Sequence, residues 1–335
     1  MKKILITGAS GFIGSFLVET ALAKTWDICA GIREGSSKQY LQDPKIDFID
    51  LKFADKKMLQ KQINEYVLAH GKWDYIIHNA GITKALNQSD FEQVNTQFCI
   101  NFVDALIAAD AVPSKFIFMS SLSAFGPGDE SGTKPLLLSS TPKPNTNYGL
   151  SKLKAEQYIQ SISNFPYMII RPTGVYGPRD RDYLMVLKMI QKGLNVGLGF
   201  KTQYLTFIYV KDLAKACFLA LESPLCQKAY FVTDGDMYTD KAYTRIAQMV
   251  MKQKRVLNCR IPLFVVAAAA QISEYMSAIS KEAAVLNKDK YKILKQRNWC
   301  CETAPLENEL KFAADYNLSK GMQESVEWYK ENKWL

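Results

Sequence analysis

The stretch KILITGASGFIGSFL, residues 3–17, joins a short apolar run to a glycine-rich turn and then to a helical pattern. The apolar run predicts a buried strand. Gly8, Gly11 and Gly14 follow it at intervals of three residues. Glycines here allow a tight turn, a close approach of the backbone to a pyrophosphate, and close packing of helix on strand. Because the helix N-terminus would face the phosphate charge, the stretch predicts a dinucleotide site.

Outward from this turn, the first half of the chain alternates between strand and helix patterns. We expect strands at 27–32, 45–50, 74–81, 115–121 and 167–174, and helices near 55–68, 90–110 and 148–163. Apolar strands separated by helices predict a parallel sheet covered on both faces. With right-handed crossovers, this is a doubly wound, Rossmann-type α/β fold.

The second half is less regular. A strand and a helix are expected over 205–222, and another strand over 228–235. From Met237 onward the pattern is mostly helical, which predicts a smaller lobe that faces the substrate. We therefore predict a dinucleotide-binding domain of residues 1–178 and 203–235, and a substrate-binding lobe of residues 179–202 and 236–335.

Composition limits the classes of protein to consider. The 335 residues are 48% hydrophobic and 22% charged, as in a globular protein, and carry a net charge of +9. The lysines are spread along the chain, so the charge suits an anionic small molecule better than a dedicated nucleic-acid surface. With 2 histidines and 7 irregularly spaced cysteines, we expect no metal site and reduced thiols.

The longest apolar run is IPLFVVAAAA, residues 261–270. It is about half the length of a membrane span, so we expect a helix packed in a domain core, or else an apolar wall of the substrate site. The N-terminal apolar segment is too short for a signal peptide. These features predict a cytoplasmic protein without a membrane partner.

The residues after the second strand bear on the choice of dinucleotide. An acid at the strand end would hold the 2′-hydroxyl of NAD, but Ile32 stands there, followed by Arg33 and, further on, Lys38. A guanidinium suits the 2′-phosphate of NADP. Glu34 keeps NAD open, because a shift of one residue in the strand end would supply the acid. We favour NADP over NAD.

The segment NTNYGLSK, residues 145–152, places Tyr148 and Lys152 four residues apart at the expected start of a helix. Residues at this spacing are neighbours on one helical face. Lowering the pKa of a tyrosine from about 10 to about 7 requires about 4 kcal/mol. A lysine cation and the positive nicotinamide ring beside the phenol would supply energy of that order. The tyrosine could then exchange a proton with a substrate oxygen while hydride moves at the attached carbon.

Several further segments point to one family. Residues 1–235 resemble the extended short-chain dehydrogenase/reductase family, in the group of NAD-dependent epimerase/dehydratases. The resemblance rests on TGASGFIG, Asp50-Leu51, HNAG (78–81), Asn95, SSLSAFG (120–126), YGLSK (148–152), RPTGVYGPR (171–179) and FIYVKDLAKA (207–216). It implies that Ser121 hydrogen-bonds the reacting oxygen, that Tyr148 transfers the proton, and that Lys152 lowers the tyrosine pKa and holds the nicotinamide ribose.

The glycine turn, the cations after the second strand and the resemblance together give a set of expected binding residues. Those for the cofactor are Gly8, Ser10, Gly11, Phe12, Ile13, Gly14, Arg33, Lys38, Asp50, Leu51, Asn79, Ala80, Gly81, Asn95, Tyr148, Lys152, Pro172 and Val175. Among these, Asp50 and Leu51 would flank the adenine, and Pro172 and Val175 would lie at the nicotinamide end. Substrate contacts are expected from Ser123, Tyr176, Arg179 and Tyr204. A homodimer through the two long central helices is expected from the family only.

Departures from the family pattern narrow the chemistry. The Asp-Glu pair of the dehydratases is replaced by Leu122 and Ser123, which argues against dehydration. Leu205 stands where many nucleotide-sugar epimerases carry a diphosphate-binding arginine, although Arg179, Arg181 and Lys201 are candidates to compensate. We therefore predict an NAD(P)-dependent oxidoreductase acting on a carbinol or carbonyl carbon. The alternatives are a nucleotide-sugar epimerase that retains its cofactor and a non-catalytic regulator that binds the cofactor.

Overall fold

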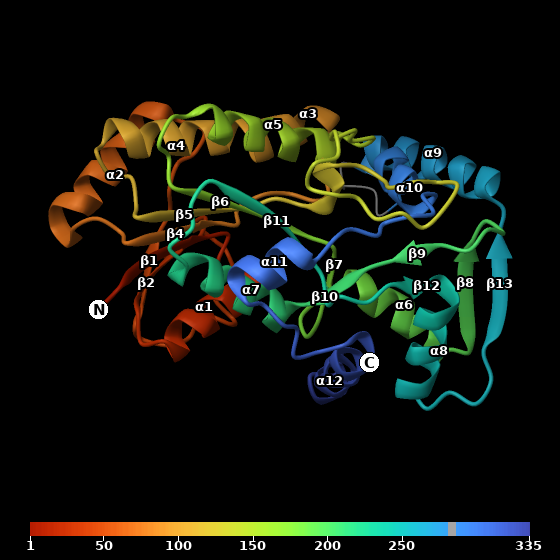
Figure 1. The fold of residues 1–335 in the computed structure, drawn as a ribbon. Helices are drawn as coiled ribbons and strands as arrows, with labels where there is room; N and C mark the ends of the chain where they lie inside the picture. The colour runs from red at the N-terminus through yellow and green to blue at the C-terminus, as the bar shows by residue number, and fades with distance from the viewer. Residues whose placement is uncertain (281–285) are drawn as a thin grey trace.

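The computed structural model describes residues 1–280 and 286–335. Its centre is a seven-stranded parallel sheet in the order β11-β6-β5-β4-β1-β2-β3 (Figure 1). The strands are β1 (Lys3–Thr7), β2 (Asp27–Gly31), β3 (Ile46–Ile49), β4 (Tyr75–His78), β5 (Lys115–Met119), β6 (Tyr167–Pro172) and β11 (Lys228–Val232). The predicted doubly wound fold is confirmed. The strand order reverses between β1 and β4, the place where such folds bind ligands.

Helices cover both faces of the sheet. Along β1, Ile4 and Ile6 point into one hydrophobic cluster and Leu5 into the other, as the two-residue period of a strand requires. The first cluster is closed by α1 (Phe12–Ala23), α7 (Val210–Glu222) and α11 (Ala304–Leu310), and the second by α2 (Lys56–His70), α4 (Phe98–Ala108) and α5 (Asn147–Ser161). Figure 1 shows these two layers below and above the sheet.

The turn between β1 and α1 allows no side chain at Gly14. A Cβ atom there would lie 2.1 Å from the carbonyl oxygen of Gly8, which itself has a φ of +66°. The contact lets α1 begin directly over the end of β1. Its N-terminus is thereby held at the switch point of the sheet, as the glycine spacing predicts.

The smaller lobe combines short strand pairs with helices. The pairs are β7 (Gly174–Tyr176) with β10 (Phe207–Tyr209), β9 (Tyr204–Leu205) with β12 (Tyr238–Thr239), and β8 (Leu194–Leu198) with β13 (Leu257–Ile261). Its helices are α6 (Asp182–Gln191), α8 (Asp240–Val250), α9 (Leu263–Ser280), α10 (Lys288–Leu294) and α12 (Leu318–Glu331). The short α3 (Gln88–Phe91) belongs to the sheet and its covering helices, where it packs on α5. The β8–β13 pair was not predicted, although both strands, LNVGL and LNCRI, carry an apolar residue at every second position. The proposed domain boundaries stay a prediction.

Residues 263–270 of the apolar run form the start of α9. This helix is packed in the core along one side only, and not all round as a core helix would be. Val266 and Ala270 are buried, but Phe264 is 75% exposed and Val265 43%. The run is apolar around the whole helix, so its sequence could not show that only one side packs. Among the described residues, no helix has the length and hydropathy to cross a bilayer.

A buried ion pair joins α5 to the sheet. The carboxylate of Glu156 accepts hydrogen bonds from Arg171 on β6, at 3.0 Å from Nε and 2.7 Å from Nη2. The two side chains are only 1% and 5% exposed. Ser120, at the end of β5, donates a further hydrogen bond to Glu156. Buried charges are stable only when they are paired and hydrogen-bonded in this way.

We expect Glu156→Ala to lower the free energy of unfolding by about 3–5 kcal/mol, because it leaves the Arg171 cation buried without its partner. The matched control is Glu65→Ala, which removes the exposed Lys61–Glu65 pair, 3.7 Å long on the surface of α2. That change should cost less than about 0.5 kcal/mol. Urea unfolding followed by circular dichroism measures both, and equal losses would contradict the structural role of the buried pair.

Candidate active site

A groove of about 1120 Å³ lies across the carboxyl ends of the central strands. It gathers the last residues of β2, β5 and β6 and the residues that directly follow β1 and β4, together with residues of α5 and α10. The predicted site residues that line it are Gly8, Ser10, Gly11, Phe12, Ile13, Arg33, Asp50, Leu51, Asn79, Ala80, Gly81, Ser121, Tyr148, Lys152, Pro172 and Val175. The fold thus brings most of the sequence-predicted residues to one place.

The N-terminus of α1 opens into this groove. Gly11 is the N-cap residue, no side chain caps the helix, and no acidic residue stands in its first turn. Helical N–H groups without side-chain partners, together with the positive end of the helix dipole, favour a bound anion. This end of the groove therefore fits a diphosphate, which Gly8, Ser10 and Gly11 would hold.

A charged cluster forms the next part of the groove. Asp50 accepts hydrogen bonds from the backbone N–H of Glu34, at 3.0 Å, and from Nζ of Lys52, at 2.6 Å. Burial acts to raise the pKa of Asp50, but these two hydrogen bonds outweigh it and hold the pKa below its ordinary value. Asp50 thus fixes the loop that carries Arg33. Arg33, Ser36 and Lys52 all line the groove here.

Three predicted cofactor residues lie outside the lining, Gly14, Lys38 and Asn95. Nζ of Lys38 sits 3.9 Å from the centre of the Phe48 ring. Gly14 packs on the turn. Asn95, also outside, lies in a π-helical segment, Glu92–Gln97, ahead of α4. Its side-chain oxygen accepts a hydrogen bond from the N–H of Ile82 at 2.9 Å, and its amide nitrogen donates one to the C=O of Ile82 at 3.0 Å. Asn95 therefore holds the loop that follows Gly81.

Ser121, Tyr148 and Lys152 all line the groove. Ser121 follows β5 and caps the short 3₁₀ turn Leu122–Ala124, accepting a hydrogen bond from the N–H of Ser123 at 3.1 Å. Tyr148 and Lys152 lie one turn apart on α5. Nζ of Lys152 donates a hydrogen bond to the carbonyl oxygen of Met119 at 2.8 Å. The three side chains thus come from the ends of β5 and α5, where the sheet fixes them.

The pKa values differ from the sequence-based expectation. Burial raises the pKa of Tyr148 above its ordinary value, and a hydrogen bond with Ser121 only partly opposes this. The predicted lowering by Lys152 is not seen, because the lysine is turned to the Met119 carbonyl. Burial lowers the pKa of Lys152 to about 8, against the opposite effects of Cys99 and Glu156. The tyrosine is therefore neutral at pH 7.

Sequence reasoning missed Asp289 on α10. Its carboxylate accepts hydrogen bonds from the backbone N–H groups of Asn147, at 2.7 Å, and Tyr148, at 3.4 Å. It thereby satisfies donors at the start of α5 that the helix itself leaves free. More than 140 residues separate the partners along the chain, so no local sequence pattern predicts the contact.

Sequence reasoning also missed a group of three charged residues at the edge of the groove. Asp182, at the start of α6, pairs with Lys84 at 2.6 Å and with Lys290 of α10 at 3.6 Å. Burial acts to raise the pKa of Asp182, but the two lysines prevail and lower it. The three residues line the groove and join the sheet domain to the lobe.

The four predicted substrate residues are not among the groove lining. Nη1 of Arg179 donates to Oγ of Ser15 at 2.9 Å, the hydroxyl of Tyr176 donates to the carbonyl of Asn317 at 3.2 Å, and Tyr204 and Ser123 are held through their backbone N–H groups. Their substrate contacts stay a prediction.

A model of the NAD dependent epimerase/dehydratase family matches residues 4–232. The chain belongs to this family. It is therefore an enzyme of a group that uses NAD or NADP, and the resemblance of its motifs is confirmed. The residue roles inferred from those motifs remain proposals.

Several related proteins align with almost the whole length of this chain. A ceramide reductase of Caulobacter vibrioides is 25% identical, over 99% of this chain and 96% of its own length. The structure of a UDP-glucose 4-epimerase with UDP-glucose from Thermotoga maritima superposes with a TM-score of 0.78 at 18% identity, over 99% of both chains. A UDP-glucuronic acid 4-epimerase from Bacillus cereus in complex with NAD gives a TM-score of 0.76 at 18% identity, over 98% of this chain and 99% of that one. At such identities the structures establish the fold alone.

We expect Arg33→Ala to weaken NADP binding at least about tenfold, because it removes a charge-assisted hydrogen bond to the 2′-phosphate. NAD binding should change by less than about twofold. Lys61→Ala is the matched control, since it removes an exposed cation of α2 that lies outside the groove lining, and it should leave both affinities nearly unchanged. Fluorescence titration measures the dissociation constants. An equal loss of affinity for NADP and NAD in Arg33→Ala would contradict a contact between Arg33 and the 2′-phosphate.

Proposed function

We propose that this enzyme is an NADP-dependent reductase or dehydrogenase that acts on a carbonyl or hydroxyl carbon. The observation that carries the proposal is the meeting of Ser121, Tyr148 and Lys152 in one groove with Arg33 and an open helix N-terminus. The first three supply an acid–base group at a reacting oxygen. The others fit the phosphates of a dinucleotide.

The cofactor supplies hydride at its nicotinamide when it is bound. The side chains of the protein donate a proton and a hydrogen bond to the carbonyl oxygen of the substrate. The neutral Tyr148 phenol donates its proton to the oxygen of the carbonyl as it gains charge, and Ser121 hydrogen-bonds the same oxygen. A tyrosine whose pKa is raised by burial starts in the protonated form that reduction requires. Lys152, one helical turn from Tyr148, is held by the Met119 carbonyl and would hold the nicotinamide ribose.

The surroundings of the groove favour a reductase over a nucleotide-sugar epimerase. Leu205 offers no charge to a diphosphate. Of the three cations that could compensate, Arg179 is bound to Ser15 and Glu19, and Lys201 lines a different pocket, so only Arg181 faces the groove. The full-length similarity to a ceramide reductase also favours reduction.

A nucleotide-sugar epimerase remains the second candidate, and Arg181 is the observation that favours it. It lines the groove at the lobe side, where it could meet a diphosphate. A non-catalytic regulator is a weaker third candidate, because all three catalytic residue types are present.

We expect Tyr148→Phe to lower the rate of carbonyl-dependent NADPH oxidation by about 10²–10⁴-fold, the usual contribution of a general acid. A panel of long-chain and aromatic ketones provides the substrates, and loss of absorbance at the NADPH band provides the rate. NADPH affinity should remain within about threefold. The control is Tyr75→Phe, at the amino end of β4 and away from the groove, which should retain full activity.

Two results would contradict the proposed function. One is ketone reduction by Tyr148→Phe at the wild-type rate. The other is interconversion of UDP-sugars by the wild-type protein without net oxidation of cofactor and with no turnover of any ketone, which would establish the epimerase.

A further inference from the structure

The outer face of α9 carries a continuous row of apolar side chains. We call it the α9 stripe; its members are Phe264, Val265, Ala268, Ala269, Ile272, Tyr275 and Met276. Spacings of three and four residues place them on one side of the helix. Phe264 is 75% exposed, Ile272 62% and Tyr275 72%, whereas Val266 and Ala270 on the opposite side are buried. This is the reverse of an ordinary surface helix, whose outer face is polar.

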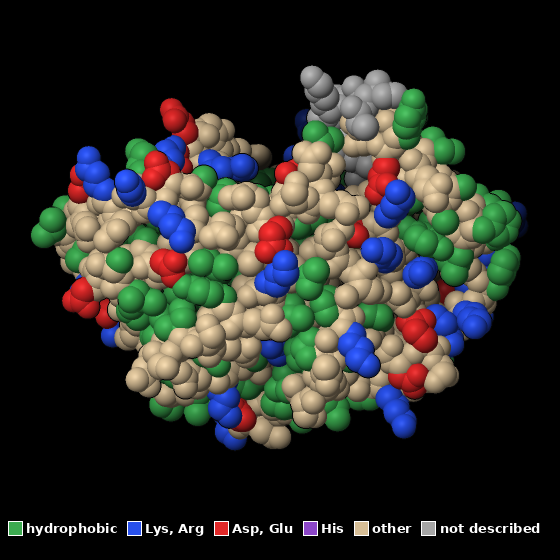
Figure 2. All heavy atoms as spheres, turned by 90° about the horizontal axis from the view of Figure 1, so that it is seen from above, with side chains coloured by type: hydrophobic (Ala, Val, Ile, Leu, Met, Phe, Trp, Pro, Cys, Tyr) green, Lys and Arg blue, Asp and Glu red, His purple; other side chains and the backbone are tan. Residues whose placement is uncertain are grey.

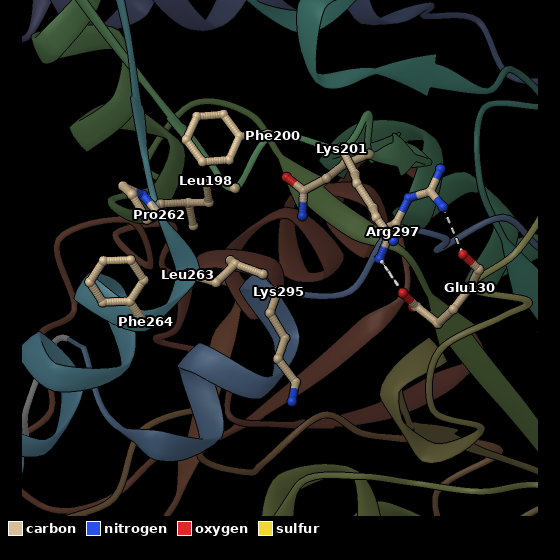
Figure 3. Close-up of a pocket in the computed structure, with 11 residues that line it drawn as sticks. Glu130, Leu198, Phe200, Lys201, Pro262, Leu263, Phe264, Lys295 and Arg297 are labelled. Carbon is tan, nitrogen blue, oxygen red and sulfur yellow. Dashed lines mark hydrogen bonds between the residues drawn. The ribbon is translucent and has the colours of Figure 1, made fainter.

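A hollow extends the stripe at the start of the helix. It measures about 530 Å³ and lies between the ends of β8 and β13, α9 and the segment after α10. Figure 3 shows Phe200, Pro262 and Phe264 on one side of it and the charged residues on the other. Phe200 is 74% exposed. The hollow thus presents apolar and charged walls side by side.

The charged side of the hollow is cationic. Arg297 is bound by Glu130, with 2.8 Å between Nη1 and the Glu130 carbonyl oxygen. Lys201 and Lys295 are exposed, and neither belongs to an ion pair found among the described residues. Lys295 lies over the Tyr291 ring, 5.5 Å from its centre. Two ammonium groups without a carboxylate partner among the described residues therefore line the same hollow as Phe200 and Phe264. Figure 2 shows hydrophobic side chains gathered with lysine and arginine at the end of the molecule where α9 lies.

We propose that the α9 stripe and Phe200 dock on the surface of an anionic lipid bilayer. The apolar side chains enter the boundary between head groups and acyl chains, and Lys201 and Lys295 meet the lipid phosphates. The helix lies in the interface and does not cross it, in keeping with the lack of a spanning helix among the described residues. The proposal revises the sequence-based expectation of no membrane partner.

A bilayer fits this surface better than a second copy of the chain does. In a symmetric dimer through the stripe, each copy would bring Lys201 and Lys295 to the same interface, where like charges repel. Anionic head groups attract them. The net charge of +9 acts in the same direction at longer range.

The docking surface is connected to the active-site groove through α10. Helix α9 packs against α10, and α10 contributes Lys290 and Ile293 to the groove lining and Asp289 to the start of α5. Docking would thus bring the lobe side of the groove to the membrane. The substrate class that follows is a carbonyl or hydroxyl lipid held in the bilayer. This last step rests on the proposed function, whereas the docking itself does not.

The test is co-sedimentation of the full-length protein with vesicles, and it needs no substrate. We expect binding to vesicles of phosphatidylglycerol and phosphatidylcholine in equal parts, and at least tenfold weaker binding to phosphatidylcholine alone. Raising the salt concentration should weaken the binding, because salt screens the lysine–phosphate attraction. Equal binding to both vesicles, or none to either, would overturn the proposal.

Two sets of variants separate the parts of the surface. Phe264→Glu and Ile272→Glu should each lower vesicle affinity at least about tenfold, and the double variant Lys201→Ala/Lys295→Ala about tenfold or more. Leu68→Glu is the matched control, since Leu68 is 86% exposed on α2, and it should bind like the wild type. Circular dichroism and thermal unfolding confirm that each variant is folded. A dimer in sedimentation velocity that Ile272→Glu dissociates, with no vesicle binding by the wild type, would assign the stripe to a second copy instead.

Discussion

Helix α5 depends on one buried interaction, the pair of Glu156 and Arg171. Tyr148, Lys152 and Glu156 follow one another at intervals of four residues, so the face that carries the proposed acid–base group also carries the ion pair that joins the helix to β6. Glu156 also accepts a hydrogen bond from Ser120, the neighbour of Ser121. One carboxylate thus fixes the relative positions of the strand end and the helix, and the groove exists in its present form because both are fixed.

The smaller lobe does more than cover this groove. Asp289 accepts hydrogen bonds from the start of α5, and the contacts of Asp182 with Lys84 and Lys290 join the rim on the sheet side to the rim on the lobe side. The position of Tyr148 is therefore set from both parts of the molecule. Changes in α10, although remote in sequence, would be felt at the reacting oxygen.

The structure also gives Tyr148 a different pKa from the one that the sequence predicts. The sequence predicts a phenol made acidic by its lysine neighbour, whereas burial keeps the pKa of Tyr148 above its ordinary value and Lys152 is directed at the Met119 carbonyl. A buried, neutral phenol is suited to donate a proton. The same arrangement holds Lys152 on the Met119 carbonyl, one helical turn along α5 from the phenol.

The sequence by itself determined the sheet and the glycine turn, because each follows from a local pattern, whereas most of the expected site residues came from the family resemblance. Apolar runs define the strands, the glycine spacing at 8–14 defines the turn, and a spacing of four unites Tyr148 with Lys152. Only the tertiary structure decided what depends on distant partners. It brought Asp289 to α5, bound Arg179 to Ser15 outside the groove lining, turned Lys152 toward Met119, and left one side of α9 uncovered. The physical reason is that burial and hydrogen bonding depend on neighbours in space, which the spacing of residues along the chain does not specify.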